Sequence, residues 1–155
     1  MASSPPPPAP PPPAWPIEPP AITRPFDPPD APYGAGHRGI DLAAGPGAEV
    51  RALLPGRVAF VGQVAGTPVV TVDHGGWRST YQPVQAEVAV GQTVRAGEVI
   101  GHTAPTGGHC AGQCLHLGVI VADAYRDPLA VLMGPPVLKP TLTPRRAVPR
   151  ADAPG

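Results

Sequence analysis

The sequence of 155 residues predicts an all-β domain of small antiparallel sheets. Short segments rich in valine are separated by Gly or Pro, which is typical of strands between turns. No window shows the periodicity of a long amphipathic helix, and one glycine-led hexapeptide occurs twice. The predicted strands are VRALL, RVAFVG, PVVTVDH, RSTYQPV, EVAV, EVIGHT and LHLGVIV.

The repeated hexapeptide reads GAEVRA at residues 47–52 and GQTVRA at residues 91–96. The second copy continues as GEVIG. Glycines at turns with valines between them suit tightly curved hairpins. We interpret the repeat as a duplicated β unit, the alternative being chance similarity in a chain rich in Gly and Val.

The predicted domain lies between two proline-rich ends. The first 32 residues hold 15 of the 27 prolines and therefore cannot form a helix. We expect residues 1–14 to be disordered or polyproline II, residues 37–134 to form the β domain, and residues 135–155 to be a disordered Pro/Arg tail. Residues 15–36 are expected to form an extended arm that packs on the domain, because its prolines alternate with apolar residues: Trp15, Ile17, Ile22, Phe26 and Tyr33.

Charge and hydropathy exclude several classes of function. Eleven Lys and Arg residues balance eleven Asp and Glu residues, so no overall field favours nucleic acid. No apolar run is long enough to span a membrane. The N-terminus shows no secretory signal, which leaves two explanations, a signal missing from this sequence or a cytoplasmic protein.

A short helical turn is expected at DPLAVLM, with Asp127 as its cap and Pro128 in the first position.

Strand alternation makes His116 a candidate metal ligand. In CLHLGVIV, the side chains of Leu115 and Leu117 fall on one face and would pack in a core. Cys114, His116 and Gly118 fall on the other face. A histidine that only fills a core would more naturally take the leucine register, so the alternation favours a functional side chain at His116.

The segment HRGID supplies two further candidate ligands, His37 and Asp41. In a straight strand their Cα atoms would be about 13 Å apart, so the segment must bend to bring both to one ion. Gly39 lies midway and permits the bend. With His116, these residues form a nitrogen and oxygen set that suits a catalytic zinc, because three protein ligands leave one position open.

Residues 36–132 resemble the lysostaphin-type zinc endopeptidases, which cut peptidoglycan cross-bridges. The matching segments, in order, are GHRGIDLAA, GAEVRALLPGRVAFVG, VVTVDHGGWRSTYQPV, VAVGQTVRAGEVIG and CLHLGVI. The resemblance implies a barrel-sandwich hybrid fold of antiparallel strands with a groove. It also implies Zn²⁺ bound by His37, Asp41 and His116, and peptidoglycan peptides as the partner.

Both catalytic histidines of this family are absent from their usual positions. The family has a histidine two residues after the tyrosine of its T-Y motif, where this chain has Pro83. The first histidine of the family's H-x-H motif is here Cys114. We predict that His109 takes over acid/base work or oxyanion contact, and that Tyr81 either offers a phenol or packs in a strand.

The two cysteines allow two interpretations. Cys114 could be a fourth, thiolate ligand, which would close the site and make the zinc structural. Alternatively, Cys110 and Cys114 form a disulfide, which implies an oxidising compartment. The HC…CLH arrangement is similar to that of secreted actinobacterial members of the family, and this resemblance favours the disulfide and a secreted or wall-associated protein.

Two functions follow as expectations. The first is a zinc hydrolase of wall peptides, in which Gly36, Gly39 and Gly118 leave room for a thin Gly- or Ala-rich peptide. The second is a wall-binding or activating module that has lost catalysis. A lipoyl-type carrier is excluded, because the only lysine, Lys139, lies in the tail. We expect a monomer that does not bind nucleic acid.

Overall fold

A computed structural model describes residues 4–6, 11–28 and 36–133, and in them nearly all regular structure is β. The larger sheet is antiparallel, and its strands lie in the order β1 (Ile22–Arg24), β2 (Ile40–Ala43), β10 (Cys114–Val121), β6 (Trp77–Gln82), β5 (Thr67–Asp73), β4 (Gly56–Val64) and β8 (Thr93–Val94). A short strand, β11 (Ala124–Arg126), pairs with β10. The smaller sheet has the order β3 (Glu49–Arg51), β9 (Val99–Thr103) and β7 (Val84–Ala86).

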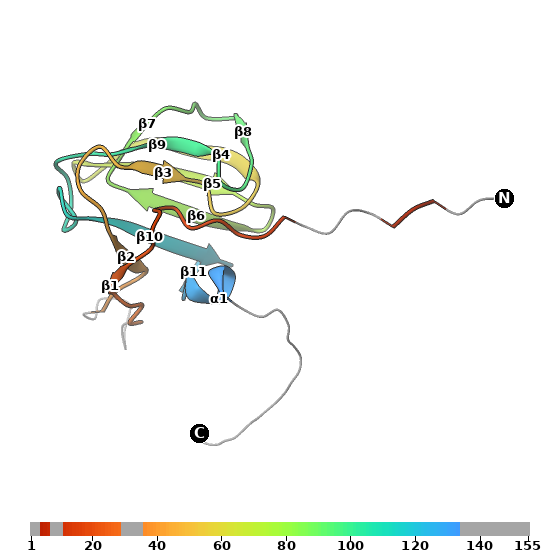
Figure 1. The fold of residues 1–155 in the computed structure, drawn as a ribbon, viewed down its shortest axis with the longest axis horizontal. Coiled ribbons are helices and arrows are strands. Elements are labelled where there is room, and N and C mark those ends of the chain that lie inside the picture. The colour runs from red at the N-terminus through yellow and green to blue at the C-terminus, as the bar shows by residue number, and fades with distance from the viewer. Residues whose placement is uncertain (1–3, 7–10, 29–35, 134–155) are drawn as a thin grey trace, which may run out of the picture.

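The prediction of an all-β fold of antiparallel sheets is confirmed. Figure 1 shows β3, β9 and β7 along one side of the domain and β10, β2 and β1 on the other. Val50 and Ile100 of the smaller sheet and Val70, Val72 and Leu117 of the larger sheet are fully buried in one apolar cluster. Burial of these side chains removes apolar surface from water and is the main favourable term in folding.

The strands of the two hexapeptide copies pair reciprocally. The first copy contains β3 and leads into β4, whereas the second contains β8 and leads into β9. β3 pairs with β9, and β8 pairs with β4, so each copy pairs with the strand that follows the other. Gly47 and Gly91 open the two copies with φ of 79° and 94°, a backbone conformation that favours glycine.

Several parts of the predicted secondary structure differ from the structure. The predicted strand EVAV is wrong, because residues 87–90 form a bend and turn. The predicted strand RSTYQPV is divided at Pro83, which has no N–H for a ladder, and the chain passes there from β6 in one sheet to β7 in the other. β1, β2, β8 and β11 had no strand prediction. The predicted helical turn is α1 (Leu129–Leu132), but its N-cap is Pro128 and not Asp127, which accepts a hydrogen bond from the Leu129 N–H at 3.0 Å.

The proline-rich arm contacts both sheets. The Ala14 N–H donates to the Leu53 carbonyl at 2.8 Å, and the Pro16 carbonyl accepts from the Arg51 N–H at 2.9 Å. Ile17 is 5% exposed and belongs to the main core. β1 then pairs with β2 at the edge of the larger sheet. Residues 135–155, predicted to be a disordered tail, lie outside the described residues.

Candidate metal centre

The three predicted ligands meet where β2 pairs with β10. Asp41 lies opposite His116 in the ladder, and His37 lies just before β2. His37 Nε2 is 3.0 Å from Asp41 Oδ1 and 3.1 Å from His116 Nδ1, and His116 Nδ1 is 2.9 Å from Asp41 Oδ1. All three residues are less than 10% exposed. The bend expected in HRGID therefore brings these side chains to one point.

The donor set and its spacing fit a zinc ion. Tetrahedral zinc with bonds near 2.0–2.1 Å has ligand atoms about 3.3 Å apart, which is close to the separations found here. Two imidazoles and a carboxylate are the donors of many catalytic zinc sites, and three protein ligands leave a fourth position for water or substrate. The side chains of His37, Asp41 and His116 can thus hold a metal without a change of backbone.

His109 reaches the same point from the loop before β10. Its Nε2 atom is 2.9 Å from Asp41 Oδ2 and 3.1 Å from Asp41 Oδ1. Its ring lies edge-on to those of His37 and His116, with centroids 5.5 and 5.3 Å away. Unlike those two residues, His109 has a side chain that is 45% exposed. It therefore connects the buried cluster to solvent.

Asp41 is the common partner of all three histidines and stays ionised. Burial of the carboxyl raises the pKa of Asp41, but hydrogen bonds from His116 and His109 and the nearby imidazoles outweigh it and lower the pKa to about 2. The carboxylate is therefore charged over the whole range in which proteins work, as a metal ligand must be.

Gly39 provides the close approach that the cluster needs. A Cβ at this position would lie 2.2 Å from the Leu117 carbonyl oxygen and 2.8 Å from His116 Nε2. Neither distance is tolerable for a real atom pair, and the first involves backbone of the paired strand. Because Gly39 has no side chain, β10 and the His116 ring can pack directly against its backbone.

A disulfide joins Cys110 to Cys114 beside the cluster. Cys110 follows His109, and Cys114 begins β10 two residues before His116, so the bridge ties the His109 loop to the ligand strand. Cys110 is 2% exposed. Both sulfur atoms are in this bond, so Cys114 is not a fourth ligand in this structure.

Tyr81 lies away from the metal centre. It pairs with Leu117 and is fully buried on the core face, whereas its neighbour Gln82 pairs with His116. The Tyr81 hydroxyl accepts from the Leu53 N–H at 3.0 Å and contacts Ser79 Oγ at 2.8 Å. Burial raises the pKa of Tyr81 to about 12. Of the two roles considered for this residue, strand packing is the one its position supports.

Replacing Tyr81 with phenylalanine should lower the free energy of unfolding by about 1–3 kcal/mol, because the buried Leu53 N–H loses its acceptor. Zinc affinity should not change. Urea denaturation and a zinc titration measure the two quantities, with Tyr125→Phe at the 40% exposed Tyr125 as the matched control. A loss of zinc affinity without a loss of stability would contradict this assignment.

The remaining candidate residues have ordinary packing roles or lie beside the cluster. A Cβ at Gly118 would lie 2.7 Å from Thr80 Oγ1, so this glycine makes room for the neighbouring strand. Gly36 is half-buried next to His37. His74 and His102, which we interpret as structural, bond instead to the Pro55 carbonyl at 2.7 Å and to Glu87 at 2.6 Å.

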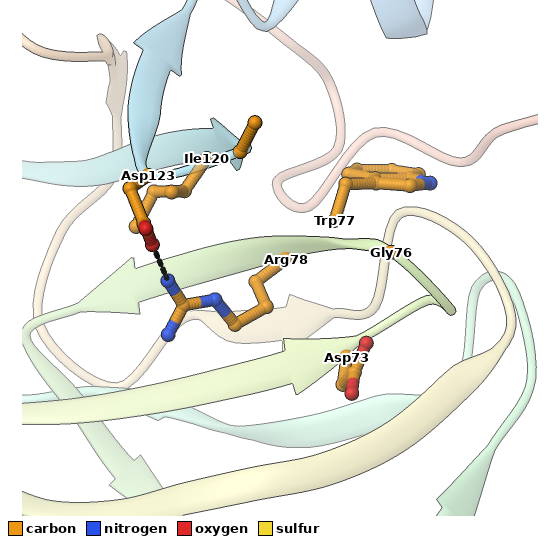
Figure 2. Close-up of a pocket in the computed structure, with 7 residues that line it drawn as sticks. Asp73, Gly76, Trp77, Arg78, Ile120 and Asp123 are labelled. Atoms are coloured by element: carbon orange, nitrogen blue, oxygen red, sulfur yellow. Dashed lines mark ion pairs between the residues drawn. The ribbon is translucent and has the colours of Figure 1, made fainter.

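Two hollows lie on the outer face of the larger sheet. The first begins beside the cluster, since Thr80 and Gln82 line it and pair with Gly118 and His116; its other lining residues include Phe60, Val64, Val69 and Tyr125. The second lies at the far end of β6 and β10 (Figure 2), where Arg78 Nη2 is 3.9 Å from Asp123 Oδ1. Arg78 lines both hollows.

One contact at the site could not be predicted from the residue types in the sequence. His37 Nδ1 lies 2.9 Å from the backbone carbonyl oxygen of Pro25, in the proline-rich arm. A main-chain oxygen is present at every residue, so no pattern of residue types marks this one. The arm was predicted to pack on the domain but not to touch a ligand.

The chain resembles known proteins in both sequence and fold. It is 44% identical over 148 residues to uncharacterized proteins of Mycobacterium tuberculosis and Mycobacterium bovis, covering 90% of this chain and 59% of theirs. It therefore spans about three fifths of the length of these relatives.

Two solved structures show the same fold. One is a zinc-containing peptidase from Vibrio cholerae, with a TM-score of 0.67 and 26% identity over 78% of this chain and 39% of that one. The other is the antimicrobial peptidase lysostaphin from Staphylococcus simulans, with a TM-score of 0.64 and 25% identity over 74% of this chain and 50% of that one. The model of Peptidase family M23 matches residues 35–128, and the chain belongs to this family.

Proposed function

We propose that this protein is a zinc-dependent endopeptidase that cleaves peptides of bacterial peptidoglycan. The observation that carries the proposal is the convergence of two buried imidazoles and an ionised carboxylate within 3.1 Å of one another. Membership of the M23 family and the likeness to lysostaphin support a peptidase that acts on the wall. Zinc in such a site supplies a Lewis acid that polarises the scissile carbonyl and activates water.

The chain's own residues would supply ligation, proton transfer and substrate contact. His37, Asp41 and His116 would hold the metal and leave one position open for water. His109 is half-exposed at the cluster, where its imidazole can take a proton from the attacking water and deliver it to the leaving amine. The exposed edge of His109 and the hollow lined by Thr80 and Gln82 are where a thin peptide would lie.

His109 matters because Pro83 and Cys114 occupy the positions of the family's usual histidines. Neither a proline nor a disulfide sulfur can transfer a proton at neutral pH. In the described residues, His109 is the one titratable side chain besides His37 and His116 that contacts Asp41. We assign it the acid/base or oxyanion role on this ground.

A second candidate function is a zinc-containing module that binds the wall or activates another hydrolase without cleaving. The loss of both usual histidines favours it, since a groove and a metal site can persist without the proton-transfer groups. The two proposals differ in one measurable property, which is whether the protein cleaves peptidoglycan peptides.

Purified full-length protein loaded with one equivalent of Zn²⁺ should release peptides with new amino termini from isolated peptidoglycan. Removal of zinc by a chelator should stop the release, and added Zn²⁺ should restore it. New amino groups are counted by a fluorescent amine label, with the Asp41→Asn variant as the metal-free control. Full zinc occupancy without release rejects the endopeptidase, and sedimentation with the wall in that case supports the binding module.

We also propose that the protein acts outside the cytoplasm as a monomer. The Cys110–Cys114 disulfide supports export, because such bonds persist in oxidising compartments. In the described part of the chain, no helix is long and apolar enough to cross a membrane. Reaction with a thiol label before and after reduction, on protein taken from the native host, tests the state of the two cysteines.

A further inference from the structure

The proline-rich arm is bonded to two of the three ligand-bearing residues. Asp27 and His37 exchange backbone hydrogen bonds: the Asp27 N–H donates to the His37 carbonyl at 2.9 Å, and the His37 N–H donates to the Asp27 carbonyl at 2.6 Å. The Thr23 hydroxyl donates to the Asp41 carbonyl at 3.4 Å. The arm thus holds the backbone on both sides of the HRGID bend.

The Pro25 carbonyl determines which nitrogen of His37 carries the hydrogen. Its oxygen lies 2.9 Å from His37 Nδ1, and a carbonyl oxygen only accepts hydrogen bonds, so Nδ1 must donate. A neutral imidazole protonated at Nδ1 has its free lone pair on Nε2. Nε2 is the atom that faces Asp41 and His116. The arm therefore selects the tautomer that a metal requires of His37.

The Pro25 carbonyl is held in place from both sides along the chain. Downstream, Asp27 is bonded to His37. Upstream, Ala14 and Pro16 bond to the chain around β3, and Ile17 is buried in the core. The Ala21 carbonyl accepts from the Ala43 N–H at 2.8 Å, which fixes the arm against β2. Prolines lose little conformational entropy on folding, because their φ is already restricted. A proline-rich arm can therefore hold an oxygen in position at low cost.

We propose that residues 14–27 are an integral part of the metal centre and that the Pro25 carbonyl is the positioning group that fixes the tautomer of His37. The inference extends the proposed function, because it takes zinc as the metal. Loss of a hydrogen-bond partner behind a ligating histidine typically lowers metal affinity by about 10- to 100-fold.

The test compares two substitutions at one exposed position of the full-length protein. Asp27→Pro removes the N–H that donates to the His37 carbonyl and should weaken zinc binding by about 10-fold or more. Asp27→Ala keeps that N–H, removes only the carboxylate, and should bind zinc as the unaltered chain does. Affinity is measured by competition with a chromophoric chelator for Zn²⁺, without peptidoglycan, so the result is independent of wall cleavage.

The tautomer is read directly in the unaltered protein. Long-range ¹H–¹⁵N NMR spectra of the Zn²⁺-loaded protein should show a hydrogen on His37 Nδ1 and none on Nε2. In the Zn²⁺-loaded protein, a hydrogen on Nε2, or zinc on Nδ1, overturns the inference even if Asp27→Pro does not fold. Equal zinc affinity of the Pro and Ala variants overturns it as well. Zinc binding and tautomer as expected, but no peptide release from the wall, would reject the endopeptidase and leave this inference standing.

Discussion

Replacing His109 with alanine should reduce peptide release from peptidoglycan by about 10²- to 10³-fold, while zinc remains bound. Besides His37 and His116, this imidazole is the titratable side chain in the described residues that contacts Asp41, and neither Pro83 nor Cys114 can transfer a proton. His37, Asp41 and His116 keep their mutual contacts without it. Initial rates at saturating Zn²⁺ and zinc content per chain are measured on the same preparation.

His102→Ala is the matched control for this variant. His102 is also partly exposed and paired with a carboxylate, Glu87, but it lies outside the metal centre. Its replacement should leave both the rate and the zinc content as they are. A His109→Ala protein that retains its rate would remove His109 from the mechanism, and one that loses its zinc would make His109 a fourth ligand rather than an acid or base.

Replacing Gly39 with alanine should prevent assembly of the metal centre and lower the free energy of unfolding by about 3 kcal/mol. The new methyl group would lie 2.2 Å from the Leu117 carbonyl oxygen and 2.8 Å from the His116 ring. Relief requires that β2 move away from β10, which separates Asp41 from His116. Denaturant titration and zinc content per chain report the two effects.

Gly45→Ala is the matched control, because a Cβ there meets no atom within 4 Å. It should change stability little and leave zinc binding intact. The steric argument fails if Gly39→Ala is as stable as Gly45→Ala and binds zinc equally well.

Most strands, and three side chains that meet at one point, could be predicted because local patterns mark them. Valine-rich segments between glycines mark strands, and alternation along β10 places His116 opposite the leucine face. The bend at Gly39 was expected because His37 and Asp41 could not otherwise reach one ion.

The errors arose where tertiary contacts decide the outcome. EVAV has the composition of a strand but no partner, since β7 already pairs with β9 at residues 84–86. The face of Tyr81 follows from its pairing with Leu117, which depends on strand register and not on composition. The contact between Pro25 and His37 is made by a main-chain oxygen, and residue types do not encode it.

The pairing of β2 with β10 has a consequence for how the protein matures. The two strands are separated by more than half of the described chain, and β3 and β9 are also far apart in sequence. Such non-local pairing makes folding slow compared with helical domains. During synthesis, the nascent polypeptide cannot complete its ligand trio until β10 has left the ribosome. On the proposed function, zinc would therefore bind late, and a chain truncated before residue 116 would retain only two of the three proposed ligands.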